Sequence, residues 1–321
     1  MQPSELTSIR VAAVRELSAC VKLFTLESTD GGLLPAFTTG SHLIITMTDA
    51  DGTWSNAYSI LSSPLDTRQY RIAVRRETPS RGGSSFMHQK VGAGSILTVS
   101  GPANLFPLAG GAARHVLIGA GIGITPMLAH VAALQASGSE YELHYCIRHE
   151  RDCLFRAELE PAARSGRLHV HVSSGGHRLD VARLFDGLAR DAHVYVCGPA
   201  GLNTAVFEAA RLRGWPQAQL HAEQFATADT AGGAFSVVLA RQGLRVQVGA
   251  NQTILEALER ASVGTVSSLC REGYCGTCET GLLEGEADHR DQYLPTEQRQ
   301  AQRSIMICVS RARTPTLVLN L

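Results

Sequence analysis

The chain has 321 residues, and its 29 Lys and Arg residues balance 29 Asp and Glu residues, so the formal net charge is zero. This length exceeds what one hydrophobic core usually organises, which predicts two or three domains. Zero net charge excludes a long-range attraction to nucleic acid or to anionic lipid. The opening residues MQPSELTSIR have no basic run followed by an apolar stretch, so we expect no secretion signal and a cytoplasmic protein.

Residues 1–109 contain short apolar runs separated by turns, namely VKLFTLES, SHLIITMT, YRIAVRRE and SILTVSGP. This rhythm is typical of an antiparallel β-barrel. In residues 110–225, apolar strands such as RHVLIGA, YELHYCIR and HVYVCGP alternate with helical patterns, which predicts a doubly wound α/β domain with a parallel sheet. The apolar stretch 115–134 is long enough to imitate a membrane span, but three glycines and Thr125-Pro126 interrupt it, so we expect no membrane segment.

Residues 226–234, ATADTAGGA, are small and polar with no apolar periodicity, which predicts an exposed linker. Residues 235–321 then form a third domain. It begins with a hairpin that turns at Gln242-Gly243, and a helix follows in TILEALERA. The residues expected to face inward from this helix are Ile254, Leu255, Leu258 and Ala261.

Four cysteines in the third domain have the strongest functional pattern of the chain. Cys270, Cys275 and Cys278 have the spacing C-x4-C-x2-C, and Cys308 lies far downstream. This is the plant-type ferredoxin arrangement, so we predict that these four thiolates hold a [2Fe-2S] cluster. The cytosol keeps thiols reduced, so cysteines in a cytoplasmic chain favour metal binding over disulfides.

The loop between these cysteines contains Gly273 and Gly276, which let the backbone wrap closely and direct N–H groups at the cluster sulfurs. The alternative is a four-cysteine zinc site. Such a site usually pairs two short C-x2-C units, and here one unit is absent, which favours the cluster. An acidic run downstream, LEGEADHRDQ at 283–292, is expected to be a solvated loop, with a docking face for a partner as the alternative.

Two Gly-rich turns are candidate phosphate sites. Arg81, Gly82, Gly83, Ser84 and Ser85 form a Gly-led turn in which N–H groups, hydroxyls and a cation can converge on a phosphate, although a tight surface turn explains the same residues. The turn GAGIGITPM at 119–127 follows a strand and precedes a helix, as a pyrophosphate loop requires. It departs from G-x-G-x-x-G, and a strand–helix turn without a ligand remains open.

Cys197, Gly198 and Pro199 follow the predicted strand HVYV. Open α/β sheets bind ligands at the carboxyl ends of their strands, so this position suits a nicotinamide pocket. A lone cysteine is otherwise an ordinary core residue, and both interpretations stay open.

In chain order, the motifs NAYS, RGGS, GAGIGITP, YCIR, VCGP and EQF, followed by the ferredoxin cysteines, resemble the phthalate dioxygenase reductase family over essentially the whole chain. That family includes vanillate demethylase reductases, and the runs SNAYSILSSP and LCREGYCGTCETGLLEGEADHRDQYLP look similar to reductase components of carnitine monooxygenases. The resemblance implies an FMN-binding barrel, an NADH-binding domain and a C-terminal [2Fe-2S] domain of the β-grasp type. It also implies a Rieske-type oxygenase as the partner, and we expect the chain alone to be a monomer.

The resemblance also implies roles for individual residues. Tyr58 and Ser59, in the motif with Asn56 and Ala57, would contact the isoalloxazine ring. Phe225 would pack against the flavin or lie beside the path to the cluster, which places Ser59, Cys197 and Phe225 at the reacting centre. The FMN phosphate would be held by Gly83, Ser84 and Ser85, and NADH by Gly121, Gly123, Thr125 and Pro126, with Cys197, Gly198 and Pro199 at the nicotinamide.

One departure from the family concerns Asn56, where many members have arginine. Arg81 or Arg75 would then supply the missing charge at the phosphate, or FMN would bind more weakly. FAD is less favoured, because we find no aromatic-bearing insert for an adenine. Arg148, after YCI, is placed to reach a 2′-phosphate but is equally explained as a surface charge, so NADH is kept on family grounds.

The expected activity follows from electron counting. A nicotinamide gives two electrons as hydride, whereas a [2Fe-2S] cluster accepts one at a time, so a flavin must stand between them. We predict an NADH-dependent reductase that passes electrons through FMN and the cluster to an oxygenase acting on carnitine or a related quaternary amine. The alternatives are an aromatic O-demethylase or dioxygenase partner, a cytochrome or other acceptor, and an iron–sulfur scaffold without reductase activity.

Overall fold

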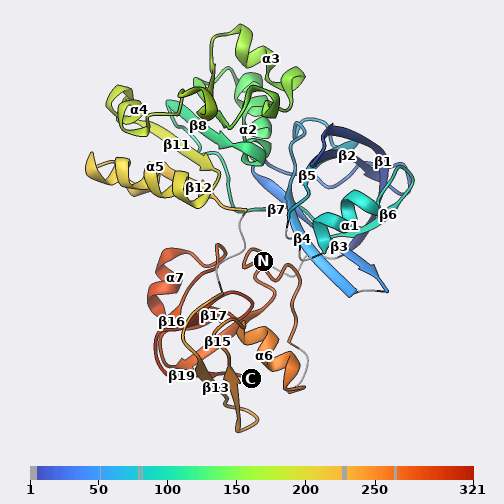
Figure 1. Ribbon diagram of the computed structural model, residues 1–321, viewed down its shortest axis with the longest axis vertical. Coiled ribbons are helices and arrows are strands. Elements are labelled where there is room, and N and C mark those ends of the chain that lie inside the picture. Colours follow the sequence, from blue (N-terminus) through green and yellow to red (C-terminus); the bar gives the residue numbers. More distant parts are fainter. Residues whose placement is uncertain (1–5, 51, 79, 81, 226–229, 264–265) are drawn as a thin grey trace. The chain divides into compact units, whose positions relative to one another are not determined.

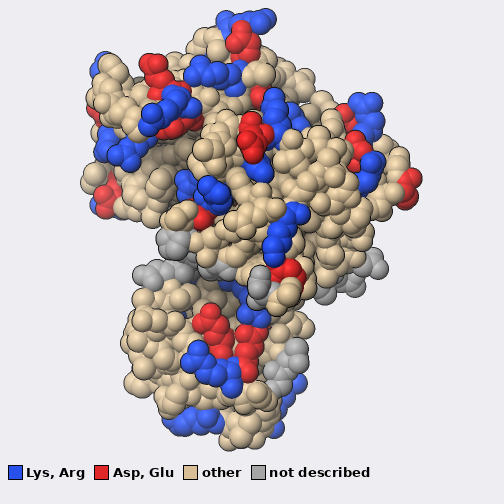
Figure 2. Space-filling view, turned by 45° about the vertical axis from the view of Figure 1, so that its right-hand side comes forward, with Lys and Arg blue, Asp and Glu red and all other residues tan. Residues whose placement is uncertain are grey.

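The computed structural model describes residues 6–50, 52–78, 80, 82–225, 230–263 and 266–321. Within these ranges the chain folds into two compact units (Figure 1), one from Leu6–Met47 and Tyr58–Ala226 and the other from Thr48–Ala57 and Thr227–Leu321. No helix in the described ranges is long and apolar enough to cross a membrane. Figure 2 shows Lys and Arg side chains interspersed with Asp and Glu on the visible face, as the zero net charge suggests.

The first sheet has seven strands in the order β4-β3-β6-β1-β2-β5, with β7 paired to β3. An antiparallel bridge between Ile60, just after β4, and Ile72 of β5 joins the two ends of this order, so the sheet closes as a barrel. The short helix α1 (Gly83–Gln89) follows the barrel strand β5. The strands are β1 (Thr7–Ser18), β2 (Val21–Ser28), β3 (Ser41–Asp49), β4 (Gly52–Ser59), β5 (Gln69–Arg75), β6 (Ile96–Val99) and β7 (Ala103–Asn104).

The second sheet is parallel throughout, in the order β10-β9-β8-β11-β12. The chain moves outward from β8 in one direction and then crosses to β11 on the other side, so the order reverses between these two strands. The reversal is the topological switch point at which open α/β sheets bind ligands. The strands are β8 (Arg114–Ala120), β9 (Tyr141–Ile147), β10 (Leu168–Val172), β11 (Ala192–Cys197) and β12 (Leu220–Glu223).

Helices cover both faces of this sheet. One face packs Leu117 and Tyr195 against α2 (Ile124–Ser137) and α3 (Arg156–Arg164). The other face packs Val116 and Val194 against α4 (Val181–Gly187) and α5 (Ala200–Leu212). The stretch that imitated a membrane span is therefore β8, a turn and the first part of α2, as expected.

The C-terminal unit has a mixed sheet in the order β14-β13-β19-β15-β17. Its central strands β13 and β19 pair in parallel, and the other pairs are antiparallel, which is the β-grasp arrangement. Two short strands, β16 (Ala287–Asp288) and β18 (Arg311–Ala312), pair beside it. The remaining elements are β13 (Phe235–Leu239), β14 (Leu244–Val248), α6 (Ile254–Arg260), β15 (Glu279–Glu284), α7 (Thr296–Ala301), β17 (Ser304–Met306) and β19 (Thr316–Leu319).

The predicted hairpin and helix of this unit are present, with one correction. Gly243 has φ of +68° in the turn between β13 and β14, a conformation that suits glycine. Helix α6 begins with a capping box between Thr253 and Glu256. Ala261 was expected to face inward, but the helix ends at Arg260 and Ala261 is exposed, while Ala257 is buried instead.

Candidate functional site

The four cysteines of the C-terminal unit meet in two pairs. The thiols of Cys270 and Cys275 hydrogen-bond to each other, and so do those of Cys278 and Cys308. The hydrogen bond from Cys270 lowers the pKa of Cys275 to about 5, and the hydrogen bond from Cys308 lowers the pKa of Cys278. Three of the four side chains are almost fully buried, and Cys275 is half-buried.

The loop that carries the first three cysteines directs backbone N–H groups at sulfur. The N–H groups of Glu272 and Tyr274 each lie 3.4 Å from Cys270 Sγ. Gly273 and Gly276 have φ of +77° and +74°. A Cβ on Gly276 would lie 2.3 Å from the Tyr293 ring, so this position tolerates only glycine in the present packing.

This donor set fits a two-iron cluster. In a [2Fe-2S] cluster each iron takes two cysteine thiolates, so two pairs of thiols are required rather than one group of four. A single zinc ion would need its ligands around one point. Across the described residues, no group of three or more His, Cys, Asp or Glu side chains is arranged to hold one ion.

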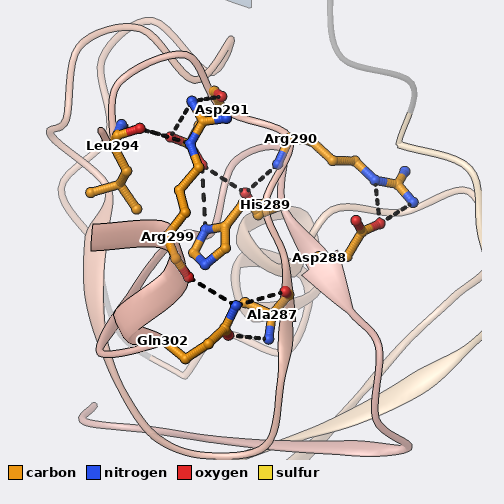
Figure 3. Close-up of polar contacts among 9 residues, drawn as sticks. Ala287, Asp288, His289, Arg290, Asp291, Leu294, Arg299 and Gln302 are labelled. Carbon is orange, nitrogen blue, oxygen red and sulfur yellow. Dashed lines mark hydrogen bonds and ion pairs between the residues drawn. The ribbon is translucent and has the colours of Figure 1, made fainter. Parts of the chain in front are cut away.

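A buried carboxylate lies near the segments that carry these thiols, and Figure 3 shows its contact with the N–H of Leu294. The side chain of Asp291 is fully buried. Its Oδ2 accepts the N–H of Leu294 at 2.8 Å, and its Oδ1 accepts the hydroxyl of Ser310 at 3.2 Å. The next residue, Gln292, donates its N–H to the carbonyl of Gly273 at 3.0 Å. Asp291 and Gln292 together therefore join the segment of Cys308 to the loop of the other three cysteines.

The acidic run at 283–292 is consequently not the solvated loop that was expected. Glu284, Gly285 and Glu286 are exposed, but Ala287 is fully buried, and the side chains of His289 and Asp291 are 6% and 0% exposed. Burial lowers the pKa of His289. Asp291 could not be identified from the sequence, because a carboxylate in an acidic run gives no signal of burial.

The Gly-rich turn at 119–127 and the end of β11 meet at the switch point. Gly121 and Gly123 form a short 3₁₀ turn between β8 and α2. A Cβ on Gly123 would lie 2.2 Å from the carbonyl oxygen of Cys197, and one on Gly198 would lie 2.8 Å from Ala120 Cβ. The two loops can approach this closely only because both positions are glycine. Thr125, in the first turn of α2, donates its hydroxyl to the carbonyl of Ile122 at 2.9 Å.

Cys197 and Glu223 are neighbours in the parallel register of β11 and β12. Cys197 is fully buried, and its burial raises the pKa of the thiol well above the usual value. Glu223 is 7% exposed, and burial raises its pKa to about 8. Its Oε2 has no hydrogen-bond partner among the described residues. Of the motif EQF only the phenylalanine was predicted to have a role, and nothing in the sequence signals that this carboxyl is buried.

The NAYS residues Asn56, Ala57, Tyr58 and Ser59 are consecutive at the end of β4. The first three are half-buried and Ser59 is buried. The Ser59 hydroxyl has no hydrogen-bond partner among the described residues, although it is buried. A buried, unpaired hydroxyl at a strand end is suited to a ligand contact, because burying a hydroxyl without a partner is otherwise unfavourable.

The Gly-led turn precedes α1. Gly82 has φ of +125°, and its N–H donates to the Ser80 hydroxyl at 3.1 Å. The Ser84 hydroxyl accepts the N–H of Glu77 at 3.2 Å. Arg81 lies outside the described residues. Arg75, the other candidate for the charge missing at Asn56, pairs with Glu77 at 2.8 Å.

The remaining predicted residues lie at the carboxyl ends of the parallel strands. Arg148 follows β9 and is exposed. Pro199 precedes α5 directly after Cys197 and Gly198. Phe225, two residues beyond β12, is 40% exposed, which is high for a large apolar side chain. Cys20, a lone cysteine of the barrel, is exposed and does not belong to a core.

Two family models match the chain. Residues 237–313 match the 2Fe-2S iron-sulfur cluster binding domain, and residues 117–208 match the oxidoreductase NAD-binding domain. The chain is 51% identical to the carnitine monooxygenase reductase subunit of Escherichia coli strain K12, with both chains covered completely. It is 44% identical to the heme-dependent oxidative N-demethylase beta subunit of Ectopseudomonas mendocina (99% of this chain, 100% of that one). It is 39% identical to the vanillate O-demethylase oxidoreductase of Pseudomonas putida (93% and 94%).

Solved structures give the same result. The structure of phthalate dioxygenase reductase is similar with a TM-score of 0.75 and 33% identity, over 98% of each chain. An intact type IV self-sufficient cytochrome P450 monooxygenase is similar with a TM-score of 0.79 and 35% identity. The match covers 98% of this chain and 41% of the P450 chain. These matches confirm the predicted fold class and oxidoreductase activity and support the cofactors FMN, NADH and [2Fe-2S]. The chain belongs to the phthalate dioxygenase reductase family, the electron-transfer reductase subunits of oxygenase systems.

Proposed function

We propose that this chain is the reductase component of a two-component Rieske-type oxygenase that acts on carnitine or a related quaternary amine. The observation that carries the proposal is the arrangement of the thiols in two pairs within a β-grasp unit, joined to a nucleotide switch point in the same chain. The identity of 51% to a carnitine monooxygenase reductase subunit over the full length supports carnitine or a related amine as the substrate of the partner oxygenase. We place the protein in the cytoplasm as a monomer.

When bound, NADH supplies hydride, FMN accepts two electrons and releases them singly, and the cluster carries one electron at a time to the oxygenase. We assign Cys270, Cys275, Cys278 and Cys308 as the cluster ligands. Tyr58, Ser59 and Phe225 would contact the flavin, and the turn at 81–85 its phosphate. Cys197 and the turn at 121–126 would hold the nicotinamide nucleotide. We propose the domains 1–109, 110–225 and 235–321 for these three tasks, with 226–234 as the linker.

The experiment that tests this function is an anaerobic titration of the purified protein with NADH, followed by visible absorbance and low-temperature EPR. We expect the flavin to bleach and the reduced [2Fe-2S] cluster to give a rhombic EPR signal. Cys308→Ser should remove or alter the EPR signal while leaving flavin bleaching intact, because Tyr58, Ser59 and the turn at 121–126 lie in the other unit. A flavin that bleaches while the wild-type cluster stays oxidised would contradict the proposal.

A heme protein is the second candidate partner, because a relative of 44% identity is the beta subunit of a heme-dependent N-demethylase. We expect NADH oxidation to be matched by substrate turnover with a Rieske-type carnitine oxygenase component. A heme-dependent N-demethylase component should give turnover at least about tenfold lower, a discrimination of about 1.4 kcal/mol. Product formation measured with each component decides between them, and equal or higher turnover with the heme component would reverse the assignment.

Glu223 should make stability depend on pH in a defined direction. Its pKa is raised from the ordinary value near 4.5 to about 8 in the folded state, so the folded chain holds this proton more tightly than the unfolded chain. The free energy of unfolding should therefore fall as pH rises between these two values. Glu223→Gln should remove this part of the pH dependence, measured by urea unfolding of the holoprotein at several pH values. The exposed Glu140→Gln is the control, and a wild-type slope retained in Glu223→Gln would refute the assignment.

Asp291 should influence the reduction potential of the cluster. Its buried carboxylate lies between the segments that carry the ligands, and a negative charge there disfavours adding an electron. Asp291→Asn keeps the shape and one of the two acceptor oxygens but removes the charge. We expect a potential higher by on the order of tens of millivolts, measured by a redox titration followed by EPR. Glu286→Gln, which removes an exposed charge of the same run, should leave the potential unchanged. Equal shifts in both variants would show that burial of Asp291 has no special effect.

A further inference from the structure

The end of the predicted linker is bound to the C-terminal unit through its backbone. Residues 231–234 are exposed, as expected, but they are not free. The N–H of Gly232 donates to the carbonyl of Ala250 at 2.8 Å. Three neighbouring carbonyl oxygens, those of Thr230, Ala231 and Gly233, accept hydrogen bonds from two arginine side chains. Hydrogen bonds to its backbone therefore hold this segment against the C-terminal unit.

The first of these arginines, Arg311, is 1% exposed and is among the largest fully buried side chains in the described part of the protein. Its guanidinium donates to the carbonyls of Thr230 at 2.7 Å and Gly233 at 2.8 Å in the linker. It also donates to the carbonyls of Gln252 at 2.5 Å and Gly249 at 3.0 Å in the loop before α6.

The shape of arginine is essential for this contact. The guanidinium is a planar fork with five N–H donors, and it also lies over the Phe235 ring, 5.1 Å from the centroid. A lysine ammonium has three donors at one point and cannot reach carbonyls on two segments in this way. A Cβ on Gly232 would lie 2.8 Å from Arg311 Nε, so the linker passes directly against the guanidinium.

The second arginine, Arg290, reinforces the same contact. Its Nη1 donates to the carbonyl of Ala231 at 2.9 Å, and its Nε to the carboxylate of Asp288 at 2.8 Å. Its backbone N–H donates to the hydroxyl of Ser310 at 3.1 Å. Ser310 lies two residues after Cys308, and Arg311 follows it. The linker is thus attached to the chain segment that provides the fourth cysteine.

We propose that Arg311 and Arg290 form a linker clamp that favours electron transfer from flavin to cluster by shortening the covalent connection that leads into the cluster unit. Along this connection the sequence has residues 226–229 between Phe225 and the first clamped residue, Thr230; without the clamp, the connection extends to Ala234. At roughly 3.5 Å per residue the maximum reach then grows from about 14 Å to about 31 Å. The effective concentration of a tethered partner falls as about the −3/2 power of tether length, so a loose clamp should slow intramolecular transfer about threefold.

This inference rests on the proposed electron route from flavin to cluster, and its test separates the two. Arg311→Met and Arg290→Met remove the clamp contacts. Arg313→Met is the matched control, because Arg313 lies two residues further along, is 59% exposed and pairs with Glu286 rather than with the linker. Holoproteins are mixed anaerobically with NADH in a stopped-flow instrument, and flavin and cluster reduction are followed at separate wavelengths.

We expect flavin reduction at the wild-type rate and cluster reduction slowed about threefold in the clamp variants, with no change in the control. Hydrogen exchange should become faster at the Gly232 amide, and the EPR signal of the reduced cluster should stay as in the wild type. If Arg311→Met does not fold, Arg290→Met carries the test. Faster exchange at Gly232 with an unchanged rate of cluster reduction would overturn the clamp. A wild-type cluster that NADH does not reduce would instead overturn the proposed function.

Discussion

The site in the C-terminal unit depends on the close approach of backbone to side chains at two glycines. Gly273 and Gly276 adopt positive φ, and a Cβ on either would collide with Val309 or with the Tyr293 ring. This approach lets the loop turn tightly enough to bring its three thiols to the distant Cys308. The thiols then meet in the two pairs that a two-iron cluster requires. The same physical constraint, a missing Cβ, brings Gly123 against the carbonyl of Cys197 in the nucleotide sheet.

The features that the sequence predicted well are those that local spacing determines. The C-x4-C-x2-C loop and the turn GAGIGITPM each lie within a dozen residues, and their glycines are needed for reasons that backbone geometry alone supplies. The strands Val21–Ser28 and Arg114–Ala120 match their predicted runs, because apolar residues recur along the first and are continuous in the second. The family comparisons confirm the interpretation that was built on the order of these motifs.

The features that the sequence did not predict depend on tertiary packing. Strand β1 was missed because two register irregularities, between Val11 and Ala13 and between Glu16 and Ser18, break the alternation of its side chains. Glu223 and Asp291 are single acidic residues whose burial is imposed by segments far away in sequence. Residues 231–234 of the linker are exposed, as expected, whereas 226–229 lie outside the described residues. The hydrogen bonds that hold this segment come from Arg311 and Arg290, which lie about 60 to 80 residues downstream. Arg81, predicted at the FMN phosphate, falls outside the described residues.

The parallel pairing of β13 and β19 has a consequence for how this protein depends on iron. All four thiols lie between these two strands in the sequence, so the pairing of β13 with β19 encloses the segments that carry the proposed cluster ligands. Metal binding and folding reinforce each other when the unfolded chain keeps the ligands apart. Loss of iron therefore weakens this unit, whereas the barrel and the parallel sheet share a hydrophobic core that includes no described residue of the C-terminal unit. Iron supply thus decides whether electrons taken from NADH can leave the flavin for the oxygenase.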